Sequence, residues 1–155
     1  MRRFVSCVTL AGLLLLLQAI TCLAGNPADI ARIKTVSGPA FVLRQSQQLP
    51  ATIGMKLAVS DVLKTGAGGS LGITMRDNSM LSIGPNTRME LSSFEFDPYE
   101  KKNGFVGSIS KGTMVYTSGL IARLNRDAVR IKTPVAVAGV KGTTLGISVE
   151  GGDNE

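Results

Sequence analysis

The stretch Ser70–Leu91, SLGITMRDNSMLSIGPNTRMEL, holds three short segments in which apolar residues alternate with polar or small ones. Alternation with a period of two predicts half-buried β-strands, because successive side chains of a strand point to opposite faces. The segments are separated by Asp77-Asn78 and by Gly84-Pro85-Asn86. Gly and Asn tolerate positive φ and Pro pre-sets φ, so both breaks predict tight turns. The centre of the chain is therefore predicted to be a run of very short strands.

The same pattern continues on both sides of this stretch. Turn signals recur roughly every 7–12 residues, a spacing typical of β-sandwiches, barrels and rolls. The apolar residues are mostly Val, Ile, Leu and Met, and 18 glycines accompany them, which favours strands over a helical bundle. We expect a single all-β domain of short strands, a β-roll or jelly-roll-like sandwich, with an irregular β-solenoid as the alternative. A helical turn is expected only at 119–126.

Several turns and strands are specific enough to be compared with a structure. Gly38-Pro39 is predicted to form a corner, and the Asn-Gly pair in Lys102-Asn103-Gly104 a hairpin tip. Lys111-Gly112 is predicted to be a turn between two strands. The remaining expectations are a hairpin loop at 45–50, strands at 105–110, 113–117, 128–132, 135–138 and 144–149, and an aromatic cap on the core from Phe94, Phe96 and Tyr99.

The first 24 residues have the layout of a secretory signal peptide. Arg2 and Arg3 precede the apolar run 8–19, and Cys22-Leu23-Ala24 supplies small residues before Gly25. An uncleaved N-terminal anchor and a lipoprotein attached at Cys22 are the alternatives. Cleavage after Ala24 leaves 25–155 as the mature domain, with no stable transmembrane span and a periplasmic location. Both cysteines lie in the removed segment, so no disulfide framework is expected.

The residue types exclude sites that depend on His or Cys in the mature domain. The chain has no His, and its two cysteines belong to the expected signal peptide, so zinc sites and Ser–His–Asp or Cys–His catalysis are excluded in the mature domain. Lys141-Gly142-Thr143 lacks the upstream glycine spacing and the helix of a phosphate-binding loop. Paired carboxylates remain formally open, and the candidates are Asp61, Asp77, Glu90, Glu95, Asp97 and Asp127. We expect no catalytic residue, no cofactor and no metal site.

A mild basic bias leaves two binding hypotheses. The formal net charge is +6, and the loss of Arg2 and Arg3 leaves the chain still positive. Arg130 and Lys132 should project from one face of a strand, with Lys141 near them, as a contact site for an anion. The alternative is an ordinary solvated strand face, because outward basic residues keep strands soluble. In an exported protein, nucleic acid is not expected as a partner, and the alternatives are anionic envelope polymers, acidic protein surfaces or no charged partner at all.

A series of motifs resembles the FecR-like domain of bacterial envelope proteins. In order, these motifs are Val36-Ser37-Gly38 with Ala40-Phe41-Val42, Asp61-Val62-Leu63-Lys64-Thr65-Gly66, Ser70-Leu71-Gly72-Ile73, Asp77-Asn78-Ser79 with Leu81-Ser82-Ile83, Gly84-Pro85-Asn86-Thr87 with Met89-Glu90-Leu91, Lys111-Gly112-Thr113, Ile131-Lys132-Thr133-Pro134 and Ala136-Val137-Ala138-Gly139-Val140-Lys141-Gly142-Thr143. The resemblance covers about 33–149. It implies structural roles for Gly38, Thr65, Gly66, Asp77, Asn78, Ser79, Gly84, Pro85, Gly112, Thr133, Pro134, Gly139, Gly142 and Thr143.

Two positions depart from the family pattern. Ser60 and Asn78 stand where the family usually has Gly, and Asn is the next-best residue for a left-handed conformation. The regulators that gave the family its name also carry a cytoplasmic anti-sigma segment, a membrane helix and a signal-receiving domain, which are not expected here.

The resemblance implies an exported, non-catalytic interaction or sensing module of the envelope that acts through protein–protein contacts. The alternatives are a binding module for an anionic envelope glycan and, further off, a carboxylate-based enzyme using Asp77 and Glu90.

Overall fold

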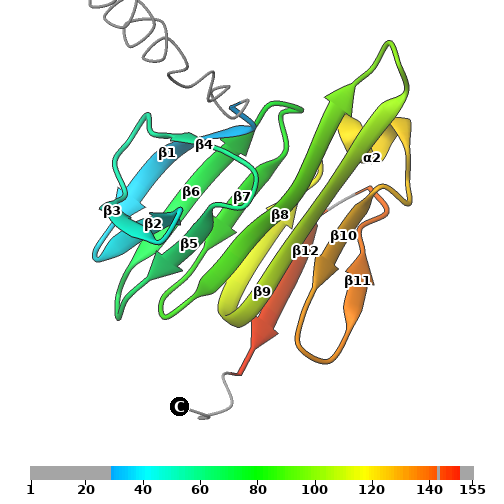
Figure 1. The fold of residues 1–155 in the computed structure, drawn as a ribbon. Coiled ribbons are helices and arrows are strands. Elements are labelled where there is room, and N and C mark those ends of the chain that lie inside the picture. The colour runs from blue at the N-terminus through cyan, green and yellow to red at the C-terminus, as the bar shows by residue number, and fades with distance from the viewer. Residues whose placement is uncertain (1–28, 143, 151–155) are drawn as a thin grey trace, which may run out of the picture.

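The computed structural model describes residues 29–142 and 144–150, which form an all-β fold with one short helix (Figure 1). The first layer, sheet A, contains β4 (Lys56–Leu57), β1 (Ala31–Ser37), β6 (Ser70–Met75), β7 (Met80–Ile83) and β12 (Thr144–Val149). The second, sheet B, contains β3 (Gln47–Pro50), β2 (Ala40–Arg44), β5 (Val62–Thr65), β8 (Arg88–Asp97), β10 (Val129–Lys132) and β11 (Val137–Gly139). The predicted all-β fold is confirmed.

One long strand joins the two layers into a twelve-stranded array. β9 (Lys102–Thr117) pairs with β8 through its first half and with β7 and β12 through its second half. It bends at Gly112, whose φ is +94°. The predicted strands 105–110 and 113–117 are therefore one strand, and Lys111-Gly112 is the corner at which it changes sheets. β10 runs parallel to β9, whereas the other pairings are antiparallel.

Alternation of apolar residues builds the core between the layers. Leu71, Ile73 and Met75 of β6 are almost fully buried, as are Leu81 and Ile83 of β7, while the residues between them face outward. The rings of Phe105 and Tyr116, from the two halves of β9, stack with their centroids 5.6 Å apart. This contact ties the layers together where β9 has folded back on itself.

Four corners, at Gly38-Pro39, Gly66–Gly69, Gly84–Thr87 and Lys111–Thr113, follow one another along the lower edge of Figure 1. Each passes the chain from one sheet to the other, and each is hydrogen-bonded to the next. The Gly66 amide donates to Pro39 O at 2.9 Å, the Asn86 amide to Gly66 O at 3.1 Å, and the Gly84 amide to Thr113 O at 2.9 Å. We call this arrangement the corner column.

The opposite end of the core is covered by α2 (Leu120–Leu124), inside the expected helical turn. Its first amides are held by the β6–β7 hairpin: Leu120 N donates to Asp77 O at 2.8 Å and Ile121 N to Asp77 Oδ2 at 3.2 Å. Asp77 is fully buried and also accepts the Ser79 hydroxyl at 2.6 Å. This aspartate therefore joins a turn to a helix 44 residues away in sequence.

Three local predictions are wrong. Lys102, Asn103 and Gly104 belong to β9, and the turn lies before them, where the Asp97 carboxylate accepts the amides of Tyr99 and Glu100. The expected loop at 45–50 contains β3, because the chain turns at Gln45 and Ser46, both with positive φ. The strand expected at 135–138 starts only at Val137.

The aromatic cap is partly corrected, because Phe94 and Phe96 pack on the core but Tyr99 is 96% exposed. The expected signal peptide, including Cys7 and Cys22, lies outside the described residues.

Candidate binding face

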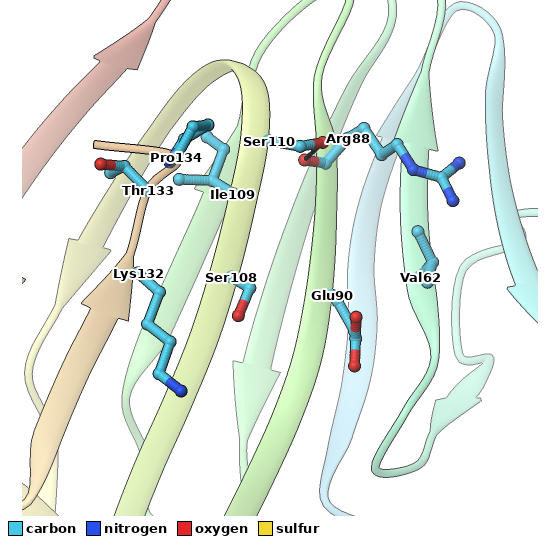
Figure 2. Close-up of a pocket in the computed structure, with 9 residues that line it drawn as sticks. All are labelled: Val62, Arg88, Glu90, Ser108, Ile109, Ser110, Lys132, Thr133 and Pro134. Carbon is cyan, nitrogen blue, oxygen red and sulfur yellow. Dashed lines mark hydrogen bonds between the residues drawn. The ribbon is translucent and has the colours of Figure 1, made fainter. Parts of the chain in front are cut away.

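The outer face of sheet B carries charged side chains from four neighbouring strands. Lys64 on β5, Arg88 on β8 and Lys111 on β9 are cross-strand partners, so they form one row. The next row runs through Glu90, Ser108 and Lys132 on β8, β9 and β10, which Figure 2 shows side by side. Arg130 points outward from β10 two residues before Lys132. We call Lys64, Arg88, Lys111, Arg130 and Lys132 the basic face.

The strand period explains why these cations are outside. On β10, Val129 and Ile131 are fully buried and Arg130 and Lys132 are exposed. On β8, Met89 and Leu91 are fully buried, so Arg88 and Glu90 point away from the core. Neighbouring strands lie about 4.8 Å apart, which places cations of one row close together. Their grouping therefore follows from strand register.

The cations of the basic face are not neutralised by carboxylates. Among the described residues, none of the five forms an ion pair shorter than 4.0 Å. Arg44 shows the contrast, because it binds the buried Asp61 through Nε and Nη2 at 2.8 and 2.6 Å. That hydrogen bond raises the pKa of the Arg44 guanidinium above its ordinary value. Glu90 is the acidic residue of the second row, and the two rows together with Arg130 keep a positive excess.

A shallow hollow of about 350 Å³ lies within the basic face. Arg88 and Lys132 line it together with Glu90; Ser108 and Ser110 lie between the residues of β8 and Lys132, and Thr133 lies at the far side, next to Pro134 (Figure 2). A second hollow of about 570 Å³ shares Ser110, Thr133 and Pro134 with it and extends to Val149 at the end of β12. Together they form a shallow surface around the β10–β11 turn, with positive charge and hydroxyl groups on one side.

The family model described as FecR protein matches residues 61–155, more than half of the chain. This chain belongs to the FecR family. The match begins at Asp61, immediately before β5, so β1 to β4 lie outside it, although β1 pairs with the matched β6 and β2 with the matched β5. No curated protein and no solved structure matches the chain.

The residues of the FecR motifs lie mainly at turns. Gly38, Thr65, Gly66, Gly84, Pro85 and Gly112 belong to the corner column or border it, and Asp77, Asn78 and Ser79 form the β6–β7 turn. Thr133 and Pro134 begin the β10–β11 turn, Gly139 ends β11, and Gly142 follows with a positive φ. Thr143 lies outside the described residues. Ser60, where FecR proteins usually have Gly, keeps a left-handed φ of +70°.

Arg130 and Lys132 lie on the same face, as the strand period predicts, but Lys141 is engaged elsewhere. Its Nζ lies 3.3 Å from the Asp127 carboxylate, and both side chains are largely exposed. Lys64, Arg88 and Lys111 were not among the predicted contact residues. Their alternation with buried residues shows in the sequence that they point outward, but not that their strands are neighbours.

The carboxylates proposed for an enzyme are not brought together. Asp77 is buried in the β6–β7 turn of sheet A, whereas Glu90 is on the outer face of sheet B. Each of the hollows described above holds a single acidic side chain, Glu90 or Glu150. No group of three potential metal ligands and no helix long and apolar enough to cross a membrane occurs in 29–142 and 144–150. The face is suited to holding an anion and lacks a paired acid and base.

Proposed function

We propose that this FecR-family chain is a non-catalytic interaction or sensing module of the bacterial envelope, which docks an acidic protein surface on its basic face. The observation that carries the proposal is the set of five cations without an ion-pair partner among the described residues. Charge complementarity of this kind steers association and selects partners. The proposal takes 1–24 as a cleaved signal peptide and 25–155 as the mature domain in the periplasm.

The shape of the face favours a macromolecular partner over a small metabolite. Pockets for small molecules are usually concave and mostly apolar, and they bury most of the ligand. Here the side chains are spread over β5, β8, β9 and β10 on the outer side of sheet B. Exposed charges of this kind raise the rate of association and the specificity of binding.

An anionic envelope glycan is the second candidate ligand. The observation that favours it is the position of the Ser108, Ser110 and Thr133 hydroxyls beside Lys132 and Arg88. Hydroxyls bind sugar hydroxyls and amides, while the cations bind carboxylate or phosphate groups. This candidate keeps Arg130 and Lys132 from the sequence hypothesis and replaces Lys141 by Arg88.

Charge reversal on the two outer faces tests both candidates. Arg88→Glu/Lys132→Glu alters the basic face, and Arg32→Glu/Lys34→Glu makes the same charge change on the outer face of sheet A, where both residues are exposed. Intact cells producing each variant are cross-linked, and captured proteins are identified by mass spectrometry. Loss of specific envelope proteins with the first variant alone supports the protein-binding proposal.

The same variants are sedimented with purified cell-wall and lipopolysaccharide preparations at low and high salt. Salt-sensitive sedimentation that only the basic-face variant loses, without a change in protein cross-links, moves the assignment to the glycan. Unchanged cross-links and unchanged sedimentation in the basic-face variant would overturn both.

A further inference from the structure

The described part of the array has four edge strands, and three of them are poorly suited to further pairing. β4 has two residues, β11 has three, and β3 has four, of which the last is Pro50. Natural proteins shorten edge strands or place Pro and charges on them, because unpaired backbone groups would otherwise recruit another chain. These three edges follow that rule.

β12 is the exception. Its sequence, TLGISV, has six residues, no charge and no proline, and it pairs along its whole length with β9. The opposite edge of β12 has no strand beside it among the described residues. A β-branched, uncharged edge of this length is a template for β-strand addition. The protein therefore leaves one edge open that differs from the others in length and chemistry.

The inner side of β12 is incompletely covered. Leu145, Ile147 and Val149 pack against the core but are only partly buried, while Thr144, Gly146 and Ser148 face outward and are exposed. The hollow of about 570 Å³ described above lies at the Val149 end of this strand. A strand added beside β12 would place its own inward side chains next to these apolar side chains and so reduce their exposure to water.

We propose that β12 pairs antiparallel with β12 of a second copy of this chain, which makes sheet A continuous through a dimer. Residues that point to the core from one strand must pair with residues that point to the core from the other. Only registers that match in this period of two are therefore possible. A two-fold axis at Ile147 satisfies this rule. It places Leu145 opposite Val149 of the second copy and Gly146 opposite Ser148, so 145–149 pair with one another and Thr144 lies opposite Glu150.

The strand and its flanks favour a copy of itself over a different partner. An isologous interface requires a self-complementary surface, and TLGISV presents an apolar residue at every second position on both sides of Ile147. Glu150 follows the strand directly. Antiparallel pairing about Ile147 places Glu150 opposite the uncharged Thr144 of the second copy, whereas parallel pairing would set the two Glu150 side chains side by side.

The test uses one substitution at two sites. Ser148→Lys places a cation on the outer side of the β12 edge, and Ser82→Lys places the same cation on the outer side of β7, an interior strand of sheet A. The full chain is expressed with its N-terminal segment, and the recovered protein is studied by analytical ultracentrifugation over a concentration series. We expect the wild type and Ser82→Lys to dimerise alike, and Ser148→Lys to raise the dissociation constant about tenfold or more.

Hydrogen exchange identifies the surface used. Amides of β12 should gain protection when the wild type is concentrated from below to above the dissociation constant, and those of β3 should not. A monomeric wild type throughout the series would overturn the proposal, as would a dimer that Ser148→Lys leaves intact. Circular dichroism of both lysine variants separates loss of pairing from loss of folding. These outcomes are independent of what binds the basic face.

Discussion

Thr65 and Thr87 stand at the edges of two successive corners, and the hydroxyl of the first accepts the amide of the second at 2.9 Å. The Thr65 hydroxyl also donates to Gly84 O at 2.6 Å, and the Thr87 hydroxyl accepts the Thr113 amide at 3.0 Å. Both side chains are buried, at 3% and 0% exposure. Two hydroxyl groups thus satisfy backbone groups that the change of sheet leaves without strand partners.

Removal of one of these hydroxyls should weaken the corner column. Thr87→Val keeps the shape of the side chain but leaves the Thr113 amide without its acceptor, so the free energy of unfolding should fall by about 1–3 kcal/mol. Urea unfolding followed by circular dichroism measures the change. Thr52→Val, at an exposed loop position, should change it by less than about 0.5 kcal/mol. Equal stability of the two variants would contradict the role assigned to Thr87.

Gly112 is expected to tolerate substitution less well than Gly54, although both glycines have a left-handed φ. Its φ is +94°, and a Cβ there would lie 2.4 Å from Thr87 Cα. Gly54 has a φ of +86° but open space around the same position. Gly54→Ala should cost about 1–2 kcal/mol from backbone strain alone, and Gly112→Ala should cost at least about 2 kcal/mol more. Similar melting temperatures for the two variants would show that the bend in β9 can shift to make room.

Substitutions of Asn78 should show whether the β6–β7 turn requires a residue that adopts the left-handed conformation easily. Its φ is +64°, a conformation that Gly and Asn adopt easily and β-branched residues do not. Asn78→Gly should therefore be tolerated or slightly stabilising, whereas Asn78→Val should destabilise by about 1–3 kcal/mol. Thermal unfolding of the two variants gives the comparison. Indistinguishable transitions would mean that the β6–β7 turn readily changes its conformation.

Tyr116 should make stability fall at high pH. Burial raises the pKa of its phenol to about 12, which the Asp77 charge reinforces and the neighbouring Ser79 opposes. Because an unfolded tyrosine ionises near pH 10, the folded state holds the proton more tightly, and stability is lost as pH rises from about 10 to 12. The full loss is about 2–3 kcal/mol.

Tyr116→Phe should remove this part of the pH dependence. The hydroxyl is buried, and the described residues offer it no hydrogen bond of acceptable geometry, so the substitution should be neutral or stabilising at pH 7. Tyr99→Phe changes a side chain that is 96% exposed and should leave the profile unaltered. Denaturant unfolding of the three proteins at pH 7, 10 and 11.5 provides the comparison. A wild-type slope retained in Tyr116→Phe would contradict the assignment to this phenol.

The sequence predicts the local features of this fold well where one short signal acts alone. The alternation in Ser70–Leu91 corresponds to β6, β7 and the start of β8, and Gly38-Pro39 forms the expected corner. The Asn-Gly signal at Asn103 fails because a competing signal lies upstream: Asp97 closes a turn on Tyr99 and Glu100, and Lys101 takes a φ of +57°. Asn103 and Gly104 are then carried into β9.

The candidate site was less predictable, since it depends on contacts between distant strands. Arg130 and Lys132 are two residues apart, so the strand period alone puts them on one face. Lys64 joins Arg88 only because β5 pairs with β8, and Lys111 joins them only because β9 pairs with β8 in one register. Likewise, Lys141 turns to Asp127, a partner that no local pattern indicates.

The corner column also bears on the order in which the protein is made. Its corners are neighbours in space in the order in which they occur along the chain, from Pro39 to Gly66, Gly84 and Thr113. A chain that emerges from its N-terminus can add each corner to the one already in place, without waiting for distant segments. Each addition closes a loop of limited length, which favours fast assembly. Among the described strands β12 comes last, and β9, the strand that it joins, has already been laid down.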